Sequence, residues 1–123
     1  LWEISDGMVR FLCLAAALLS PLPSNFIAID EPEVGFHPRL LPIIGDMIKM
    51  ASEKTQVFIT THNPDLLNRF DISDVAVLSR KGEEASTCWY RPSDRKSLVN
   101  MLKSVTGDTL GDLHRSGELE ALG

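Results

Sequence analysis

The sequence is poor in cysteine, has no excess of positive charge and contains no long apolar run. Its two cysteines, Cys13 and Cys88, form no CxxC pair and show no metal-ligand spacing with the histidines, so the pattern predicts free thiols. The formal net charge of −5 at pH 7 excludes a global basic field that would collect nucleic acid. The apolar run within residues 9–19 is too short to span a bilayer, and the nearby Glu3 and Asp6 disfavour an export signal.

The overall composition is that of an ordinary globular protein, with 44 % hydrophobic and 24 % charged residues. A chain of 123 residues buries, on folding, about two thirds of the surface that it exposes when unfolded. We therefore expect one compact domain with one core.

The first two elements are predicted by apolar spacing. Residues 6–20 place apolar side chains on one helix face, and Ser5 before them is a natural N-cap. Phe26–Ile29 is a continuous apolar run, which is typical of a strand covered on both faces in a parallel sheet.

The same order of strand and helix then repeats. Residues 38–54 predict a second helix, and Val57–Thr60 predicts a second buried strand. Asn63 can cap a third helix that begins at Pro64 and extends to Phe70. This alternation predicts an α/β fold with a mostly parallel sheet and flanking helices, in which functional residues gather beyond the carboxyl ends of the strands.

The last third of the chain has a weaker pattern. Val75–Leu78 and Thr87–Tyr90 flank a polar stretch and predict an antiparallel hairpin with its turn at Gly82. Residues 94–104 predict a helix, and the segment from Gly107 predicts a short helix followed by a frayed end.

Two adjacent carboxylates, Asp30 and Glu31, directly follow the first predicted strand. A magnesium ion that carries a nucleotide needs a carboxylate near its water shell, and a second carboxylate can activate the attacking water. The alternative is that the pair only caps the following turn. The apolar run before the pair favours the interpretation that it serves a magnesium–nucleotide site.

Two further clusters have both a functional and a structural interpretation. Ser5, Asp6 and Gly7 begin a helix, where free N–H groups and the helix dipole can bind an anion, or where Ser5 acts only as an N-cap. His62 follows the second strand and can donate a hydrogen bond toward a ligand beside Glu31, or can be a structural residue. His114 lies in a polar tail, where we expect a surface position.

Taken in order, the three clusters resemble the signature, Walker B and switch-histidine motifs of ABC-type ATPases. The resemblance covers about residues 3 to 70 and depends on three segments in that family's order, namely Ile4–Met8, Phe26–Pro32 and Thr61–His62. It implies a P-loop NTPase-like lobe.

The sequence departs from the transporters of that superfamily. Asp6 and Met8 stand where transporters usually have Gly and Gln, and His37 stands where their D-loop has an Asp. The segment from Asp30 to Pro38 is similar to that of the soluble RecF-like and SMC-like branch, which includes AAA-type ATPases of anti-phage systems. The resemblance therefore implies a cytoplasmic ATPase of DNA repair, genome maintenance or phage defence, with no membrane partner.

The resemblance also implies a role for each motif residue. Asp30 would hold Mg²⁺ through water, Glu31 would activate the lytic water, and His62 would contact the γ-phosphate of ATP. Ser5, Asp6 and Gly7 would complete the nucleotide site of a second copy, so that ATP joins two chains in a dimer.

One expected motif is missing from the chain. A P-loop requires a glycine followed by lysine, and none of the eight glycines has one. Because the chain also begins with Leu, we expect residues 1–123 to be the C-terminal part of one ATPase domain that is inactive on its own. DNA or an effector protein would contact other segments of the parent.

The alternative function is a module in which nucleotide binding gates dimerisation or partner contact with little or no hydrolysis. His37 in the D-loop and the missing P-loop favour it. A transporter subunit is a third interpretation, and it lacks the acidic D-loop residue that such subunits carry.

Overall fold

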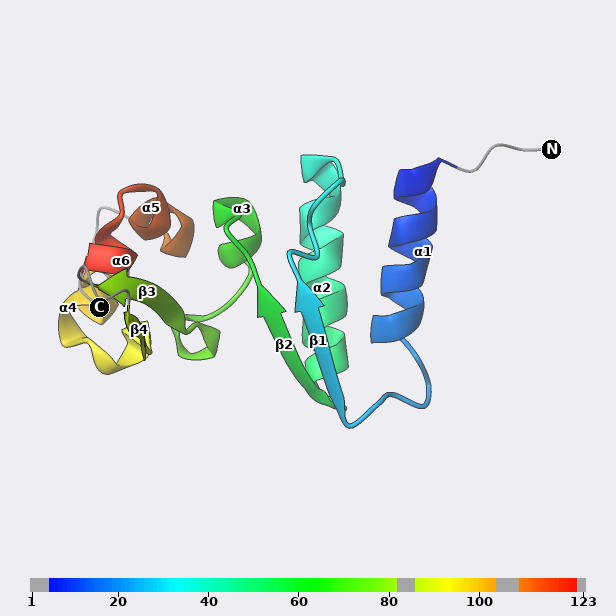
Figure 1. Cartoon of the computed structure of the whole chain (residues 1–123), viewed down its shortest axis with the longest axis horizontal. Helices are drawn as coiled ribbons and strands as arrows, with labels where there is room; N and C mark the ends of the chain where they lie inside the picture. The colour runs from blue at the N-terminus through cyan, green and yellow to red at the C-terminus, as the bar shows by residue number, and fades with distance from the viewer. Residues whose placement is uncertain (1–4, 82–85, 104–108, 122–123) are drawn as a thin grey trace. The chain divides into compact units, whose positions relative to one another are not determined.

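The computed structural model describes residues 5–81, 86–103 and 109–121. The chain divides into two compact units, residues 1–69 and 70–123, where the sequence predicted a single core. The reason is that the parallel strands belong to the first unit and the hairpin forms a separate sheet in the second (Figure 1).

Helix α1 (Asp6–Leu18) opens the described chain. Ser5 is its N-cap, as predicted, and the Ser5 hydroxyl accepts a hydrogen bond from the Met8 N–H at 3.4 Å. The helix ends two residues earlier than predicted, at Leu18 instead of Ser20. The following Pro21 explains this, because the residue before a proline disfavours helical backbone.

The predicted strand–helix–strand unit is present. Strand β1 (Phe26–Asp30) leads through a short 3₁₀ turn (Pro38–Leu40) into helix α2 (Leu41–Ser52), and strand β2 (Gln56–Thr60) follows. The two strands are parallel and in register from Phe26 opposite Gln56 to Asp30 opposite Thr60, which confirms the predicted parallel pair. Their arrowheads point to the same end of the unit (Figure 1).

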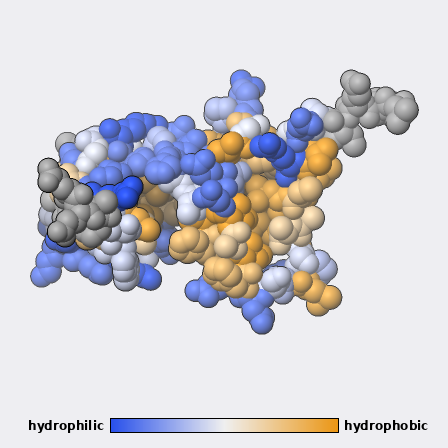
Figure 2. Space-filling view, viewed as in Figure 1, coloured by the Kyte–Doolittle hydropathy of each residue, from blue (hydrophilic) through white to orange (hydrophobic). Residues whose placement is uncertain are grey.

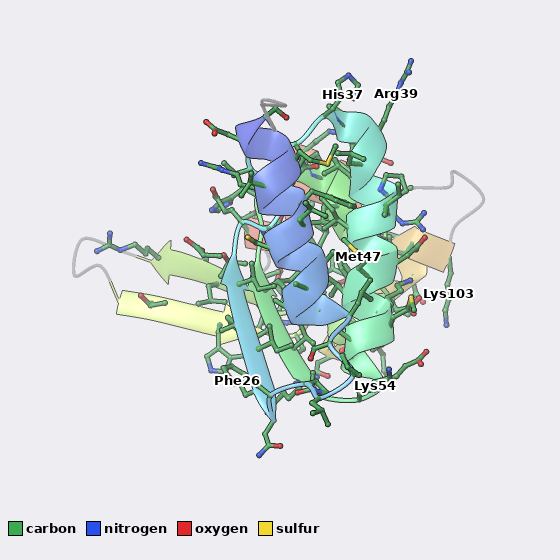
Figure 3. The ribbon with its side chains drawn as sticks, turned by 90° about the vertical axis from the view of Figure 1, so that its right-hand side faces the viewer. Phe26, His37, Arg39, Met47, Lys54 and Lys103 are labelled. Carbon is green, nitrogen blue, oxygen red and sulfur yellow. The ribbon has the colours of Figure 1, made fainter. Side chains whose placement is uncertain are left out.

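Helices cover one face of this two-stranded sheet. Helix α2 contacts both α1 and β2, and in Figure 3 α2 lies beside the strands while α1 lies nearest the viewer. On the opposite face the side chains are exposed, including Phe26 at 53 % and Phe58 at 52 %. The prediction that both faces are buried is therefore wrong for this chain, because residues of both strands alternate between half-buried and exposed.

Helix α3 (Pro64–Leu67) completes the first unit. It is one turn long and ends before Phe70, which the sequence placed on it. The core of this unit consists mainly of α2 side chains, together with residues of α1 and α3: Leu18, Leu41, Ile44, Met47, Ile48, Ala51, Leu66 and Leu67.

The second unit contains the predicted hairpin, shifted along the chain. Strand β3 (Val77–Lys81) pairs antiparallel with strand β4 (Ser86–Tyr90), whereas the sequence placed the first strand at Val75–Leu78. The predicted turn at Gly82 lies outside the described residues.

In the described residues after the hairpin, the α-helices are α4 (Lys96–Lys103), α5 (Leu110–Arg115) and α6 (Glu118–Ala121). The tail therefore contains two short helices where one was predicted. His114 was expected at the surface, but it is partly buried. Its Nδ1 lies 2.7 Å from Oε1 of Glu120.

Both cysteines are free, as predicted, and both are exposed. Within the described ranges, no helix is both long enough and apolar enough to cross a membrane.

Candidate functional site

The carboxyl ends of β1 and β2 lie side by side and hold the acidic pair. Asp30 is the register partner of Thr60, whose hydroxyl donates to Oδ1 of Asp30. The Glu31 N–H donates to the Thr60 carbonyl at 3.1 Å and lies 3.3 Å from its hydroxyl oxygen. The backbone and side chain of one threonine on β2 therefore fix the positions of both acidic residues on β1.

Glu31 has an unusual backbone conformation. Its φ is +44°, and among the described non-glycine residues it alone has a positive φ. Left-handed backbone costs an L-residue roughly 1–2 kcal/mol. Such strain concentrates at functional sites, where the surrounding structure holds it in place. Here Glu31 ends the strand and starts a turn closed by the Val34 N–H on the Glu31 carbonyl at 3.1 Å.

The next acidic residue, Glu33, is buried, with 8 % of its surface exposed. The hydroxyl of Thr61 donates to its Oε1, while its Oε2 has no hydrogen-bond partner among the described residues. No role was predicted for Glu33. Two signals could have identified it: a second threonine follows Thr60 at the end of β2, and Glu33 stands two positions after Glu31 in the loop that follows β1.

His62 follows these threonines and is exposed. Because Thr60 is paired with Asp30, the fold carries His62 to the sheet edge where Asp30 and Glu31 lie. Asn63 caps α3 as predicted, since its side-chain oxygen accepts from the N–H groups of Asp65 at 2.9 Å and Leu66 at 3.2 Å. The cap sets the direction of the chain directly after His62.

A second cluster forms where α1 begins. Ser5 and Gly7 line a hollow of about 350 Å³ together with the loop that follows the acidic residues. A Cβ on Gly7 would lie 3.9 Å from the carbonyl oxygen of Gly35, so helix and loop are close. Phe11 and Phe36 pack edge to face nearby, with ring centroids 6.1 Å apart. Asp6 is exposed and does not line the hollow.

His37 has a local role in this loop. Its Nδ1 accepts from the Arg39 N–H at 3.2 Å and so caps the 3₁₀ turn before α2. An Asp at this position would cap in the same way. Figure 3 shows His37 at the opposite end of the unit from Phe26, beyond the carboxyl end of β1.

The donor set at the strand ends fits a magnesium ion that arrives with a nucleotide. Asp30 is exposed, and its Oδ1 accepts from Thr60. A carboxylate has about four acceptor positions, so further positions remain for metal-bound water. The described residues contain no group of three or more His, Cys, Asp or Glu that could hold a metal. Magnesium prefers one or two carboxylates, water and substrate phosphates.

Comparison with known proteins identifies related sequences. A family described as "AAA domain, putative AbiEii toxin, Type IV TA system" matches residues 1–68. The Septu protein PtuA of Bacillus mycoides is 31 % identical over 125 aligned positions, which cover 91 % of this chain and 18 % of the relative.

Two other relatives are similar over shorter regions. The "Putative ABC transporter ATP-binding protein MG303" of Mycoplasma genitalium is 27 % identical over 66 % of this chain and 22 % of its own length. The DNA repair protein RecN of Rickettsia conorii is 32 % identical over 57 % of this chain and 13 % of its own length. The chain thus spans less than a quarter of each of these relatives. The match over more than half of its residues shows that this chain belongs to the AAA-domain family described above, within the P-loop ATPase class.

Proposed function

We propose that residues 1–123 are the C-terminal part of a soluble ABC-type ATPase domain that binds and hydrolyses ATP as a nucleotide-sandwiched dimer. The observation that carries the proposal is the parallel register of β1 and β2. It pairs Asp30 with Thr60 and so brings Asp30, Glu31 and His62 to one sheet edge. This edge lies within the segment that matches the ATPase family.

Each residue at the edge has a distinct role in the proposal. Asp30 would hold the magnesium ion through water, and the bound ion would supply positive charge that offsets the charge of the phosphates. Glu31 accepts the proton of the attacking water, and His62 hydrogen-bonds the γ-phosphate. Ser5, Asp6 and Gly7 of a second copy close the site through N–H groups at the start of α1, where the helix dipole favours an anion.

The exposed face of the β1–β2 sheet supports the proposal that this is part of a larger domain. A sheet in an α/β protein is covered on both faces, whereas Phe26 and Phe58 here remain half exposed. We propose that the P-loop part of the same ATPase covers this face. That part would supply the glycine-rich loop and lysine that cradle the phosphates.

The test is Glu31→Gln in the full-length ATPase. Removing the proton acceptor lowers kcat by roughly 10²- to 10⁴-fold, because that is the usual contribution of a general base. ATP affinity and ATP-dependent dimerisation remain, since Asp30 and the start of α1 are unchanged. Phosphate release, nucleotide binding and sedimentation measure the three properties separately.

The matched control is Glu53→Gln, which changes an exposed carboxylate at the end of α2. It leaves kcat within about twofold, since surface changes away from a site are close to neutral. Undiminished hydrolysis in Glu31→Gln would remove Glu31 from the mechanism.

The second candidate is a nucleotide-gated interaction module without hydrolysis. The specific observation in its favour is His37, which replaces the D-loop Asp and caps the next turn. ATP-dependent dimerisation of the unsubstituted full-length protein without phosphate release would select this function.

The relatives suggest the pathway. RecN is named for DNA repair, and the family description names a toxin–antitoxin system. We propose a role in genome maintenance or phage defence, in which DNA or an effector protein contacts other segments of the parent in the cytoplasm.

A further inference from the structure

Glu33 is the buried charged residue of the described chain, and its burial needs a physical explanation. It is 8 % exposed, and its carboxylate receives a hydrogen bond at Oε1, while Oε2 has no partner. A buried carboxylate costs several kcal/mol unless its oxygens are paired. A fold selected only for stability would place an apolar side chain here.

The partner of Glu33 lies on the neighbouring strand end. Thr61 donates its hydroxyl proton to Glu33, and the same oxygen accepts from the Asn63 N–H at 2.9 Å. Asn63 in turn caps α3, whose Leu66 is fully buried in the core. A chain of hydrogen bonds therefore runs from the acidic loop, through the strand end, to the start of α3.

The Glu33–Thr61 hydrogen bond adds to those that Thr60 makes with Asp30 and with the Glu31 N–H. Thr60 holds Asp30, and Thr61 holds Glu33. Glu31 lies between the two held residues on the loop, in its strained conformation. His62 follows the two threonines directly on the other segment. The two hydrogen bonds thus fasten the loop on either side of Glu31 to the segment that carries His62.

We propose that Glu33 is a positioning residue of the ATPase site. Its hydrogen bond with Thr61 fixes the spacing between Glu31 and His62, so that the water-activating and phosphate-contacting groups keep one geometry. This inference depends on the proposed function, because it assigns Glu33 to the same hydrolytic site. Misplacing a reacting group by about 1 Å can cost about 10² in rate.

The decisive variant is Glu33→Leu in the full-length ATPase. Leu fills a similar volume and removes both the hydrogen bond and the buried charge. Apolar replacement of buried ionic groups is often neutral or stabilising, so the melting temperature stays level or rises. We expect kcat to fall by roughly 10- to 100-fold, with the KM for ATP changed by less than about threefold, because no group that binds ATP is altered. A purely structural residue would not produce a stable but slow enzyme.

Conservative variants test the hydrogen bond. Glu33→Gln keeps an oxygen that accepts from Thr61, and Thr61→Ser keeps the hydroxyl, so both retain most of kcat. Thr61→Val loses the donor and also the acceptor of the Asn63 N–H, so it slows hydrolysis at least as much as Glu33→Leu. The double variant Glu33→Leu/Thr61→Val is no slower than Thr61→Val, because both single changes remove the Glu33–Thr61 hydrogen bond. Glu53→Leu, at an exposed position, is the matched control.

Hydrogen exchange provides a readout that does not depend on activity. In Glu33→Leu, amide exchange rises in residues 31–37 and 61–63, and it stays the same in α2. Three results would each overturn the inference. They are an unchanged kcat in Glu33→Leu, a loss of kcat in Glu33→Gln equal to that in Glu33→Leu, and additive effects in the double variant. In these cases the unsubstituted protein still hydrolyses ATP, and the proposed function stands. Absence of hydrolysis in the unsubstituted protein would overturn the proposed function and this inference together.

Discussion

The first unit of the chain, residues 1–69, leaves many large apolar side chains exposed, whereas the second, residues 70–123, leaves few. Among the described residues, the exposed ones of the first unit are Met8, Val9, Leu12, Leu19, Leu22, Phe26, Val34, Ile43, Met50 and Phe58. Those of the second unit are Leu78 and Trp89. Figure 2 shows apolar residues gathered over the first unit.

Long-range contacts hold each unit together. The first unit joins segments far apart in sequence through the strand pair and the Glu33–Thr61 bond. The second joins β4 to the C-terminal helices through the hydrogen bond from the Tyr90 hydroxyl to the Leu119 carbonyl, in addition to an adjacent hairpin and the capping box between Thr109 and Asp112. The family match ends at residue 68, where the first unit ends. The unit with the candidate site is therefore the one that exposes more large apolar side chains.

The largest expected effect concerns the exposed sheet face. Phe58→Ala destabilises this chain by about 1 kcal/mol, because only part of the ring is buried. In the proposed full-length ATPase the same change costs about 3–5 kcal/mol, the usual cost of truncating a buried Phe. Denaturant unfolding of both proteins measures the difference. Equal costs in the two would show that nothing covers this face.

Matched core truncations test whether the units are separate. Ile44 in the first unit and Leu98 in the second are both fully buried. Each change to Ala lowers the free energy of unfolding by about 2–5 kcal/mol, since a cavity is added to the lost burial. Hydrogen exchange should lose protection mainly in the unit that carries the change. Equal loss across residues 5–121 would contradict the division into two units.

A smaller effect is expected at the capping box of α5. Thr109→Ala costs about 1 kcal/mol, because the hydroxyl that accepts from the Asp112 N–H at 3.2 Å is lost. In the folded chain, hydrogen bonds from the Thr109 side chain and backbone lower the pKa of Asp112 below its ordinary value of 3.8. The stability that these hydrogen bonds to the Asp112 carboxylate provide is therefore present above pH 3.8, and it is lost as the pH falls through the folded-state pKa.

The pH dependence separates two roles of Thr109 in that cap: its hydroxyl accepts from the Asp112 N–H, and its side chain and backbone donate to the Asp112 carboxylate. The stability difference between the unsubstituted chain and Thr109→Ala should narrow as the pH falls below 3.8. Thermal unfolding at a series of pH values measures it, and Ser73→Ala at an exposed position is the control. If the stability difference between the two proteins does not change with pH, the hydrogen bonds from Thr109 do not lower the pKa of Asp112.

The smallest effect is spectroscopic and concerns Tyr90, the single tyrosine of the sequence. Burial raises its pKa above 10.0, Glu120 raises it further, and Arg95 opposes the shift. Its contribution to stability is full below pH 10.0 and is lost as the pH rises through the folded-state pKa. Ultraviolet titration of tyrosinate should show a lower pKa in Glu120→Gln. A pKa that does not move would exclude Glu120 as a cause.

Local features were predictable from sequence because neighbouring residues create them. Ser5 and Asn63 cap their helices as expected, and the alternation of strand and helix correctly predicted a parallel pair. That pair brings Asp30 and His62 to one sheet edge, as expected. The catalytic roles of these residues remain predictions.

Features that depend on contacts between residues far apart in the sequence could be identified only from the tertiary structure. An apolar run such as Phe26–Ile29 shows that a strand can be buried, but it does not show whether its covering residues belong to the same chain. From the sequence alone, Glu33 is an ordinary loop carboxylate. The parallel register of β1 and β2 places Thr61 within hydrogen-bonding distance of it. Residue spacing along one segment encodes helices, strands and caps. Which loop meets which strand end follows from the parallel pairing of β1 and β2, with α2 packed on β2.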